Sequence, residues 1–174
     1  ADPHMDMPPV LTALGARVTV TGPQGERTFP VEALCTGYYE TVLARNELIS
    51  RIIVPPQANR PAAYMKVTTR AAHDWPALGV AVVLDMQGAQ IAKASVIVGA
   101  ATDKPTRLTA AEVVLQGASV DDATLRRAGE AGAEELDIVG DPHGSASYKK
   151  HLLRVYLGRA VRIALEASGR KDHA

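Results

Sequence analysis

The strongest constraint on the fold is a change of pattern at Pro105. Short apolar runs that are rich in β-branched residues precede it, at 48–54, 63–69, 78–86 and 91–98. Such runs are typical of strands. Apolar residues at helical spacing follow it, over 109–115, 121–136 and 148–167. Strands followed by helices, without alternation, predict an α+β fold: a small antiparallel sheet covered by a three-helix C-terminal bundle.

Local signals refine this prediction. The run 78–86 is almost continuously apolar, so we expect a buried central strand, paired with 91–98 in a hairpin around Gln87-Gly88-Ala89. Thr109 and Glu112 have the spacing of a capping box. The segment 148–167 has the clearest helical pattern.

Composition excludes several classes of partner. Nineteen basic residues balance nineteen acidic ones, which argues against a nucleic-acid partner held by phosphate contacts. Cys35 is the only cysteine and the five histidines are scattered, with His143 and His151 isolated, so no metal site is expected. The apolar runs are shorter than the roughly 20 residues that span a bilayer. We therefore expect no membrane segment and a cytoplasmic location.

Five short motifs in a fixed order carry a resemblance to a known family. They are 1–8 (ADPHMDMP), 37–41 (GYYET), 47–55 (ELISRIIVP), Tyr64-Met65-Lys66 followed by Arg70, and Asp74-Trp75-Pro76. In this order and spacing they resemble the flavin-binding medium subunit of molybdenum hydroxylases. This family includes aerobic carbon monoxide dehydrogenase and the middle domain of xanthine dehydrogenase. The resemblance extends to about Glu166, and it implies that Tyr148 docks the last helix on the sheet.

The resemblance implies a division of the chain and a function. Residues 1–57 would be the C-terminal part of the α/β FAD-binding domain, and residues 58–174 a C-terminal α+β domain. The protein would be an oxidoreductase subunit that passes electrons from iron–sulfur clusters through FAD to an external acceptor. The molybdenum cofactor and 2Fe-2S clusters would lie only on its partners, a large molybdopterin subunit and a small iron–sulfur subunit, in a hetero-oligomer. The substrate is left open, as is the acceptor: NAD, quinone or oxygen.

FAD binding by these residues alone is expected to be weak or absent. The glycine-rich loops that hold the FAD pyrophosphate in the family would precede Ala1, and the 174 residues contain no such pair of loops. The fragment alone is therefore expected to be inactive. The alternative is an assembly or subunit-docking module without bound cofactor and without catalytic function.

The resemblance places Asp6 and Ile49 at the flavin nucleotide. Asp6 would face a sugar hydroxyl, whereas its position before Pro8 alone suggests a helix N-cap. Ile49 would pack against the flavin, whereas its strand context alone suggests ordinary core packing.

Lys66 and Trp75 are the other two candidates for the cofactor site. A lysine beside a flavin stabilises negative charge on the reduced ring, although a strand lysine is usually solvated. Trp75 would lie against the ring, as an aromatic residue does in the carbon monoxide dehydrogenase branch; a lone tryptophan is otherwise most often core. Arg70 is expected to brace the loop through a carboxylate such as Asp74. No residue is expected to be a proton-transfer catalyst.

Overall fold

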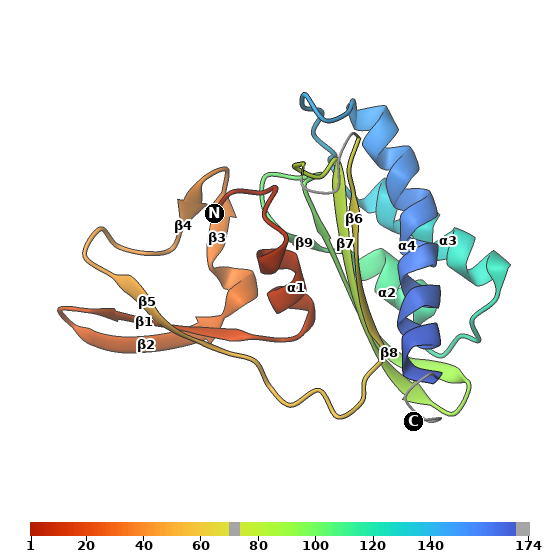
Figure 1. The fold of residues 1–174 in the computed structure, drawn as a ribbon, viewed down its shortest axis with the longest axis horizontal. Helices are drawn as coiled ribbons and strands as arrows, with labels where there is room; N and C mark the ends of the chain where they lie inside the picture. The colour runs from red at the N-terminus through yellow and green to blue at the C-terminus, as the bar shows by residue number, and fades with distance from the viewer. Residues whose placement is uncertain (70–73, 170–174) are drawn as a thin grey trace.

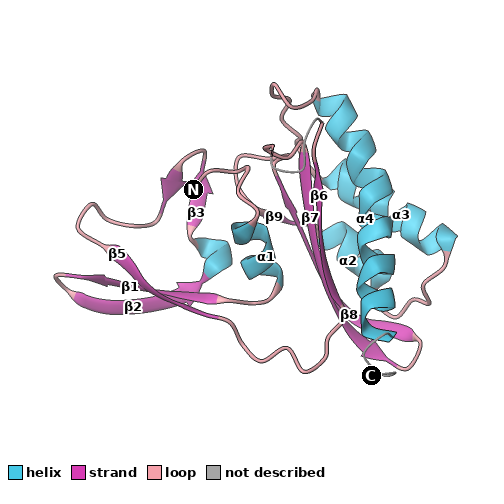
Figure 2. Ribbon diagram, viewed as in Figure 1, coloured by secondary structure: helices cyan, strands magenta, loops and turns pink. Residues whose placement is uncertain are grey.

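The computed structural model describes residues 1–69 and 74–169, and in that part of the chain helices cover antiparallel sheets (Figures 1 and 2). The strands are β1 (Arg17–Gly22), β2 (Gly25–Pro30), β3 (Cys35–Gly37), β4 (Glu40–Thr41), β5 (Leu48–Ile53), β6 (Ala62–Val67), β7 (Leu78–Gln87), β8 (Gln90–Gly99) and β9 (Thr106–Arg107). The helices are α1 (Met7–Ala13), α2 (Thr109–Leu115), α3 (Asp122–Glu135) and α4 (Ala146–Gly169), with a 3-10 turn at Val31–Ala33. The α+β prediction is confirmed.

The larger sheet has the strand order β6-β7-β8-β9, and all its neighbouring strands are antiparallel. Strand β7 is central and buried from Leu78 to Leu84, as its apolar run predicts. Because successive side chains of a strand point to opposite faces, β7 serves two cores. Val82 and Leu84 belong to the core on the side of the C-terminal helices, whereas Ala81 and Val83 pack with α1.

Three helices cover one face of this sheet (Figure 1). Helix α4 packs against β6 and β7, α2 packs against β8, and α3 packs against both other helices. Fully buried residues recur on α4 at helical spacing: Leu153, Leu157, Ala160, Val161 and Ala164. No helix in the described ranges, 1–69 and 74–169, is long and apolar enough to cross a membrane.

The first part of the chain forms a three-stranded sheet of order β2-β1-β5 and a small β3-β4 pair. Its core is small and centres on Val18 and Val20 of β1 together with Val31. Helix α1 lies between the two larger sheets, packing against β7 and β8 on one side and the 3-10 turn on the other. Strand β5 lies at the edge of its sheet, and all six of its residues are exposed.

The N-terminal segment is fastened to the end of β8. The backbone N–H of Ala100 donates to the carbonyl of Pro3 at 3.0 Å. A Cβ on Gly99 would lie 3.1 Å from Pro9 Cγ, so a glycine permits the close approach. Ala100 has a φ of 62°, which is uncommon for a residue other than glycine. This junction therefore has a locally strained backbone that tertiary contacts hold in place.

The expected capping box of α2 is wrong. The N-cap residue is Leu108, which has no side-chain capping hydrogen bond, and the backbone N–H of Ala110 in the first turn donates to Glu135 of α3 at 2.8 Å. Glu112 instead accepts hydrogen bonds from the backbone N–H of Val96 and from Arg107, both at 2.8 Å. Its carboxylate therefore joins the helix to the sheet, a long-range role that local spacing does not reveal.

Candidate functional site

Asp6 links α1 to strand β6. It occupies the N-cap position of α1, but its side chain makes no capping hydrogen bond. One carboxylate oxygen accepts from the Tyr64 hydroxyl at 2.6 Å, and the other accepts from Lys66 Nζ at 3.0 Å. A capping role for this side chain is therefore wrong, because both oxygens are engaged by residues about 60 positions away in the sequence.

Tyr64 and Lys66 reach the same carboxylate because they are two residues apart on β6 and share a face of the strand. The Tyr64 ring fits over the neighbouring strand because Gly79 has no Cβ; one would lie 2.6 Å from the hydroxyl. Burial raises the pKa of Tyr64, and its hydrogen bond to Asp6 raises the pKa further. Lys66 is 26% exposed in its ion pair, so it is not a freely solvated lysine.

Trp75 lies in an aromatic cluster with two histidines. Its ring stacks on His4, with centroids 5.2 Å apart and planes inclined by 27°. His143 lies 5.4 Å from His4 and 6.1 Å from Trp75. His143 is therefore not isolated, contrary to the sequence-based expectation. Trp75 is 45% exposed, so it is not a core residue either.

A buried charge pair lies behind this cluster. Lys149 is fully buried and donates from Nζ to Asp141 Oδ2 and to the Ala100 carbonyl, both at 2.5 Å. His4 Nε2 lies 2.8 Å from the same Asp141 oxygen. Burial opposes ionisation of Asp141, but the hydrogen bonds from Lys149 and His4 outweigh it and hold the pKa of Asp141 below its usual value. Tyr148, which was expected to dock α4, is 43% exposed; its neighbour Lys149 does so instead.

Ile49 lies apart from the other three predicted site residues. It is on β5, in the smaller sheet, and is 44% exposed, which is inconsistent with ordinary core packing. Asp6, Lys66 and Trp75 instead meet around residues 4–6: Asp6 binds Lys66, and His4 stacks on Trp75. Within the described ranges, no hydrogen bond, ion pair or ring contact joins Ile49 to them. Arg70 lies outside the described residues, so its expected contact with a carboxylate such as Asp74 is not described.

The sequence patterns did not lead to a role for His4, Tyr64, Asp141 or Lys149. Lys149 did carry a usable signal, since it precedes Leu152 and Leu153 by three and four positions on the apolar stripe of the last helix. A lysine at such a position requires a buried partner. The partner is eight residues upstream in a loop, where helical spacing does not apply.

The arrangement offers a flat stacking surface and a positive charge beside one N-terminal segment. No group of three or more histidine, cysteine or acidic side chains suited to a metal is found among residues 1–69 and 74–169. A half-exposed indole provides a surface for ring stacking. Lys66 provides a cation beside the same N-terminal segment, and Ile49 an exposed apolar side chain on a separate strand. These residue types fit an isoalloxazine ring.

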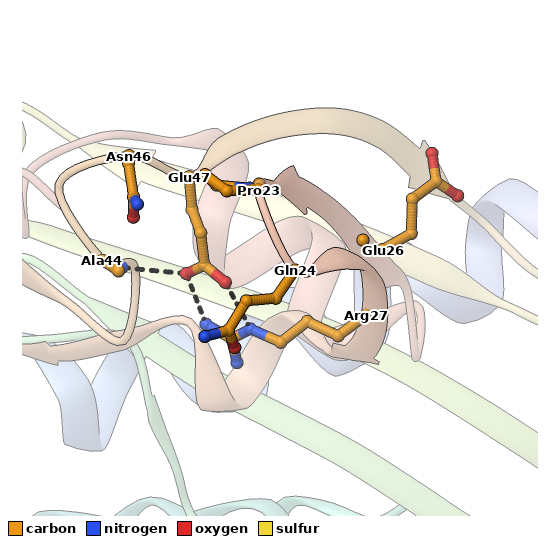
Figure 3. A pocket seen from close by; sticks show the side chains of 9 residues that line it. Pro23, Gln24, Glu26, Arg27, Ala44, Asn46 and Glu47 are labelled. Atoms are coloured by element: carbon orange, nitrogen blue, oxygen red, sulfur yellow. Dashed lines mark hydrogen bonds and ion pairs between the residues drawn. The ribbon is translucent and has the colours of Figure 1, made fainter.

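A hollow of about 350 Å³ at the β1–β2 hairpin has a structural explanation (Figure 3). The Arg27 guanidinium and the Glu47 carboxylate point toward each other there, with N···O distances of 2.9 and 2.8 Å. The backbone N–H of Ala44 also donates to Glu47 at 2.8 Å. The hydrogen bond from Arg27 is the largest cause that lowers the pKa of Glu47, to about 2. Because these charges satisfy each other, we assign no ligand to this hollow.

Comparison with known proteins gives two family matches. Residues 1–57 match the FAD binding domain in molybdopterin dehydrogenase, and residues 63–164 match the CO dehydrogenase flavoprotein C-terminal domain. Among solved structures, carbon monoxide dehydrogenase from Hydrogenophaga pseudoflava, in a form that lacks the Mo-pyranopterin moiety, is similar with a TM-score of 0.89. That match has 30% identity and covers 95% of this chain and 57% of the other.

Two curated relatives are similar over most of this chain. The nicotine 6-hydroxylase medium subunit of Paenarthrobacter nicotinovorans is 34% identical, over 90% of this chain and 54% of its own length. The carbon monoxide dehydrogenase medium chain of Afipia carboxidovorans is 32% identical, over 94% of this chain and 57% of its own length. The chain thus spans little more than half the length of these relatives. On the family match over residues 63–164, it belongs to the CO dehydrogenase flavoprotein C-terminal domain family.

Proposed function

We propose that this chain is part of the FAD-binding medium subunit of a molybdenum hydroxylase. In that enzyme it would serve as the oxidoreductase component that passes electrons from iron–sulfur clusters through FAD to an external acceptor. The observation that carries the proposal is the meeting of Lys66, Asp6 and Trp75 around residues 4–6. These are residues for which the resemblance implies a flavin contact.

FAD supplies the redox chemistry when bound, and the protein orients and tunes it. Lys66 would supply a positive charge that stabilises negative charge on the reduced ring. Asp6 offsets part of that charge, because its carboxylate lies 3.0 Å from the ammonium group. Trp75 offers a flat surface for stacking, and Ile49 offers an apolar contact from the other sheet. No residue of this chain is required to transfer a proton.

The partners follow from the same proposal. The molybdenum cofactor and the 2Fe-2S clusters would lie on a large molybdopterin subunit and a small iron–sulfur subunit of a cytoplasmic hetero-oligomer. The names of the relatives, medium subunit and medium chain, support a position within a larger complex. Residues 1–57 would complete the FAD-binding domain, and residues 58–174 would form the second domain.

A docking module without cofactor is the second candidate, and strand β5 favours it. Leu48 is 76% exposed and Ile52 is 52% exposed, although both are large and apolar. An apolar edge strand with unpaired backbone groups is a surface to which another strand can bind. In this reading the chain assembles subunits, and the Asp6–Lys66 pair is structural.

An absorbance spectrum separates the two candidates. The enzyme complex isolated with this chain should show oxidised-flavin bands, near roughly 370 and 450 nm as for any flavin. A complex that contains iron–sulfur clusters and molybdenum but no flavin would contradict the proposed function.

The 174-residue chain alone should bind added FAD weakly or not at all. It contains no pair of glycine-rich loops whose N–H groups could satisfy the pyrophosphate. Flavin fluorescence during a titration measures this binding. Saturation at low micromolar FAD would show that the contacts described above suffice without those loops.

A further inference from the structure

We infer that His4 is a positioning residue that fixes the orientation of the Trp75 ring, and that through this ring it shapes the flavin site. The second half of the inference rests on the proposed function. The first half depends only on the chain itself. It concerns a histidine that no part of the proposed electron transfer uses.

His4 is held at several points. It is 7% exposed, and its backbone N–H donates to Asp2 Oδ1 at 3.0 Å. Its Nε2 lies 2.8 Å from Asp141 Oδ2. An ionised carboxylate only accepts hydrogen bonds, so His4 carries a proton on Nε2 in this contact. The ring plane of His4 is thereby fixed relative to the loop before α4.

Asp141 is itself immobilised. Its Oδ2 also accepts from Lys149, which has no exposed surface, and its Oδ1 accepts from the backbone N–H of His143 at 2.8 Å. Lys149 bonds in addition to the carbonyl of Ala100, whose N–H holds Pro3. The N-terminal segment, the end of β8 and the start of α4 thus meet in one hydrogen-bonded network. His4 is the member of this network that contacts Trp75.

Trp75 takes its orientation from this network. It lies between β6 and β7, outside either strand. The ring contacts found for it in the described residues are those with His4 and His143. The contact with His4 is the closer and the more nearly parallel of the two, at 5.2 Å and 27°. Since 45% of Trp75 is exposed, an aromatic ligand can stack on it while His4 holds it.

Two replacements of His4 separate its two contacts. His4→Gln keeps an amide donor for Asp141 and removes the aromatic ring. His4→Phe keeps a ring for stacking and removes the donor. His151→Ala is the matched control, because His151 is an exposed histidine on α4.

The first readout is the fluorescence of Trp75, the only tryptophan of the chain. His4→Gln should reduce the anisotropy and the near-ultraviolet circular dichroism of Trp75. It should also raise acrylamide quenching up to about twofold, as the side chain goes from 45% exposed toward full exposure. His4→Phe should restore most of these signals, and His151→Ala should change none. Unaltered Trp75 signals in a folded His4→Gln chain would overturn the inference.

The second readout is the rate of flavin reoxidation in the holoenzyme. We expect His4→Gln to change this rate in the same direction as Trp75→Ala, with partial rescue by His4→Phe. A change in Trp75→Ala without one in His4→Gln would overturn the positioning role. An unchanged reoxidation rate in both variants would instead overturn the flavin contact on which the proposed function depends. If His4→Gln fails to fold, His4→Phe provides the test. A Trp75 anisotropy in folded His4→Phe as low as that of the unfolded chain would overturn the inference.

Discussion

Strands β7 and β5 are both apolar and antiparallel to their neighbours, yet residues 78–84 of β7 are buried and all of β5 is exposed. Strand β7 has α1 on one face and the C-terminal helices on the other. Strand β5 pairs with β1 along one edge, and each of its six residues remains exposed. An apolar strand therefore predicts that its side chains need burial by a neighbouring layer, and the tertiary fold decides whether the chain itself supplies that layer.

The largest loss of stability is expected from the hydrogen-bonded network that joins the N-terminal segment to the end of β8 and the start of α4. Lys149→Met leaves Asp141 without its buried ammonium partner, and such a loss typically costs about 3–5 kcal/mol. Urea unfolding measures this cost. The control is Lys150→Met, since Lys150 pairs with the 62%-exposed Glu134 and should cost less than about 1 kcal/mol. Equal costs for the two lysines would show that the junction contributes little.

The next prediction compares the two strands directly. Leu84→Ala in β7 removes a side chain with no exposed surface and should destabilise the chain by about 2–5 kcal/mol. Ile52→Ala in β5 removes one that is 52% exposed and should cost no more than about 1 kcal/mol. Denaturant midpoints give both values. A cost at Ile52 that matches the cost at Leu84 would mean that β5 is covered in solution, for example by a second molecule.

A smaller effect is expected from acid. The pKa of Asp141 is lower in the folded than in the unfolded chain, so its ionised form stabilises the fold above the unfolded value, about pH 4. That contribution is lost as the pH falls through the folded pKa. Asp141→Asn should therefore be less stable near neutral pH and lose less stability on acidification. Denaturant midpoints across this range test it, with the exposed Asp122→Asn as control; parallel pH profiles for Asp141→Asn and wild type would contradict the assignment.

Local pattern predicted the elements well but not the polar contacts between them. The apolar run of β7 and the helical spacing of α4 correctly predicted a buried central strand and a long packed helix. The Asp6–Lys66 ion pair could not be predicted from the sequence. Residue type made each side chain a candidate, but only the tertiary fold brings together two residues that are 60 positions apart. The same holds for Glu112, which accepts hydrogen bonds from Val96 and Arg107 instead of forming the predicted capping box.

The exposure of Ile49 shows a second property that the sequence pattern does not predict. A strand pattern indicates which side chains need burial, but it does not indicate which element or molecule buries them. The strand context alone therefore suggested ordinary packing for Ile49, whereas 44% of its surface is exposed in the structure. Its flavin contact stays a prediction, as do those of Asp6, Lys66 and Trp75.

The flavin midpoint potential tests whether a flavin lies beside the Asp6–Lys66 pair. In the holoenzyme, Lys66→Met should make the flavin harder to reduce and lower the potential by roughly 20–40 mV, the scale of one partly screened charge. Asp6→Asn should raise it, because Lys66 loses the carboxylate that offsets its charge. Lys93→Met, at an exposed position on β8, should leave the potential unchanged. Potentials that equal the wild-type value in both Lys66→Met and Asp6→Asn would contradict the claim.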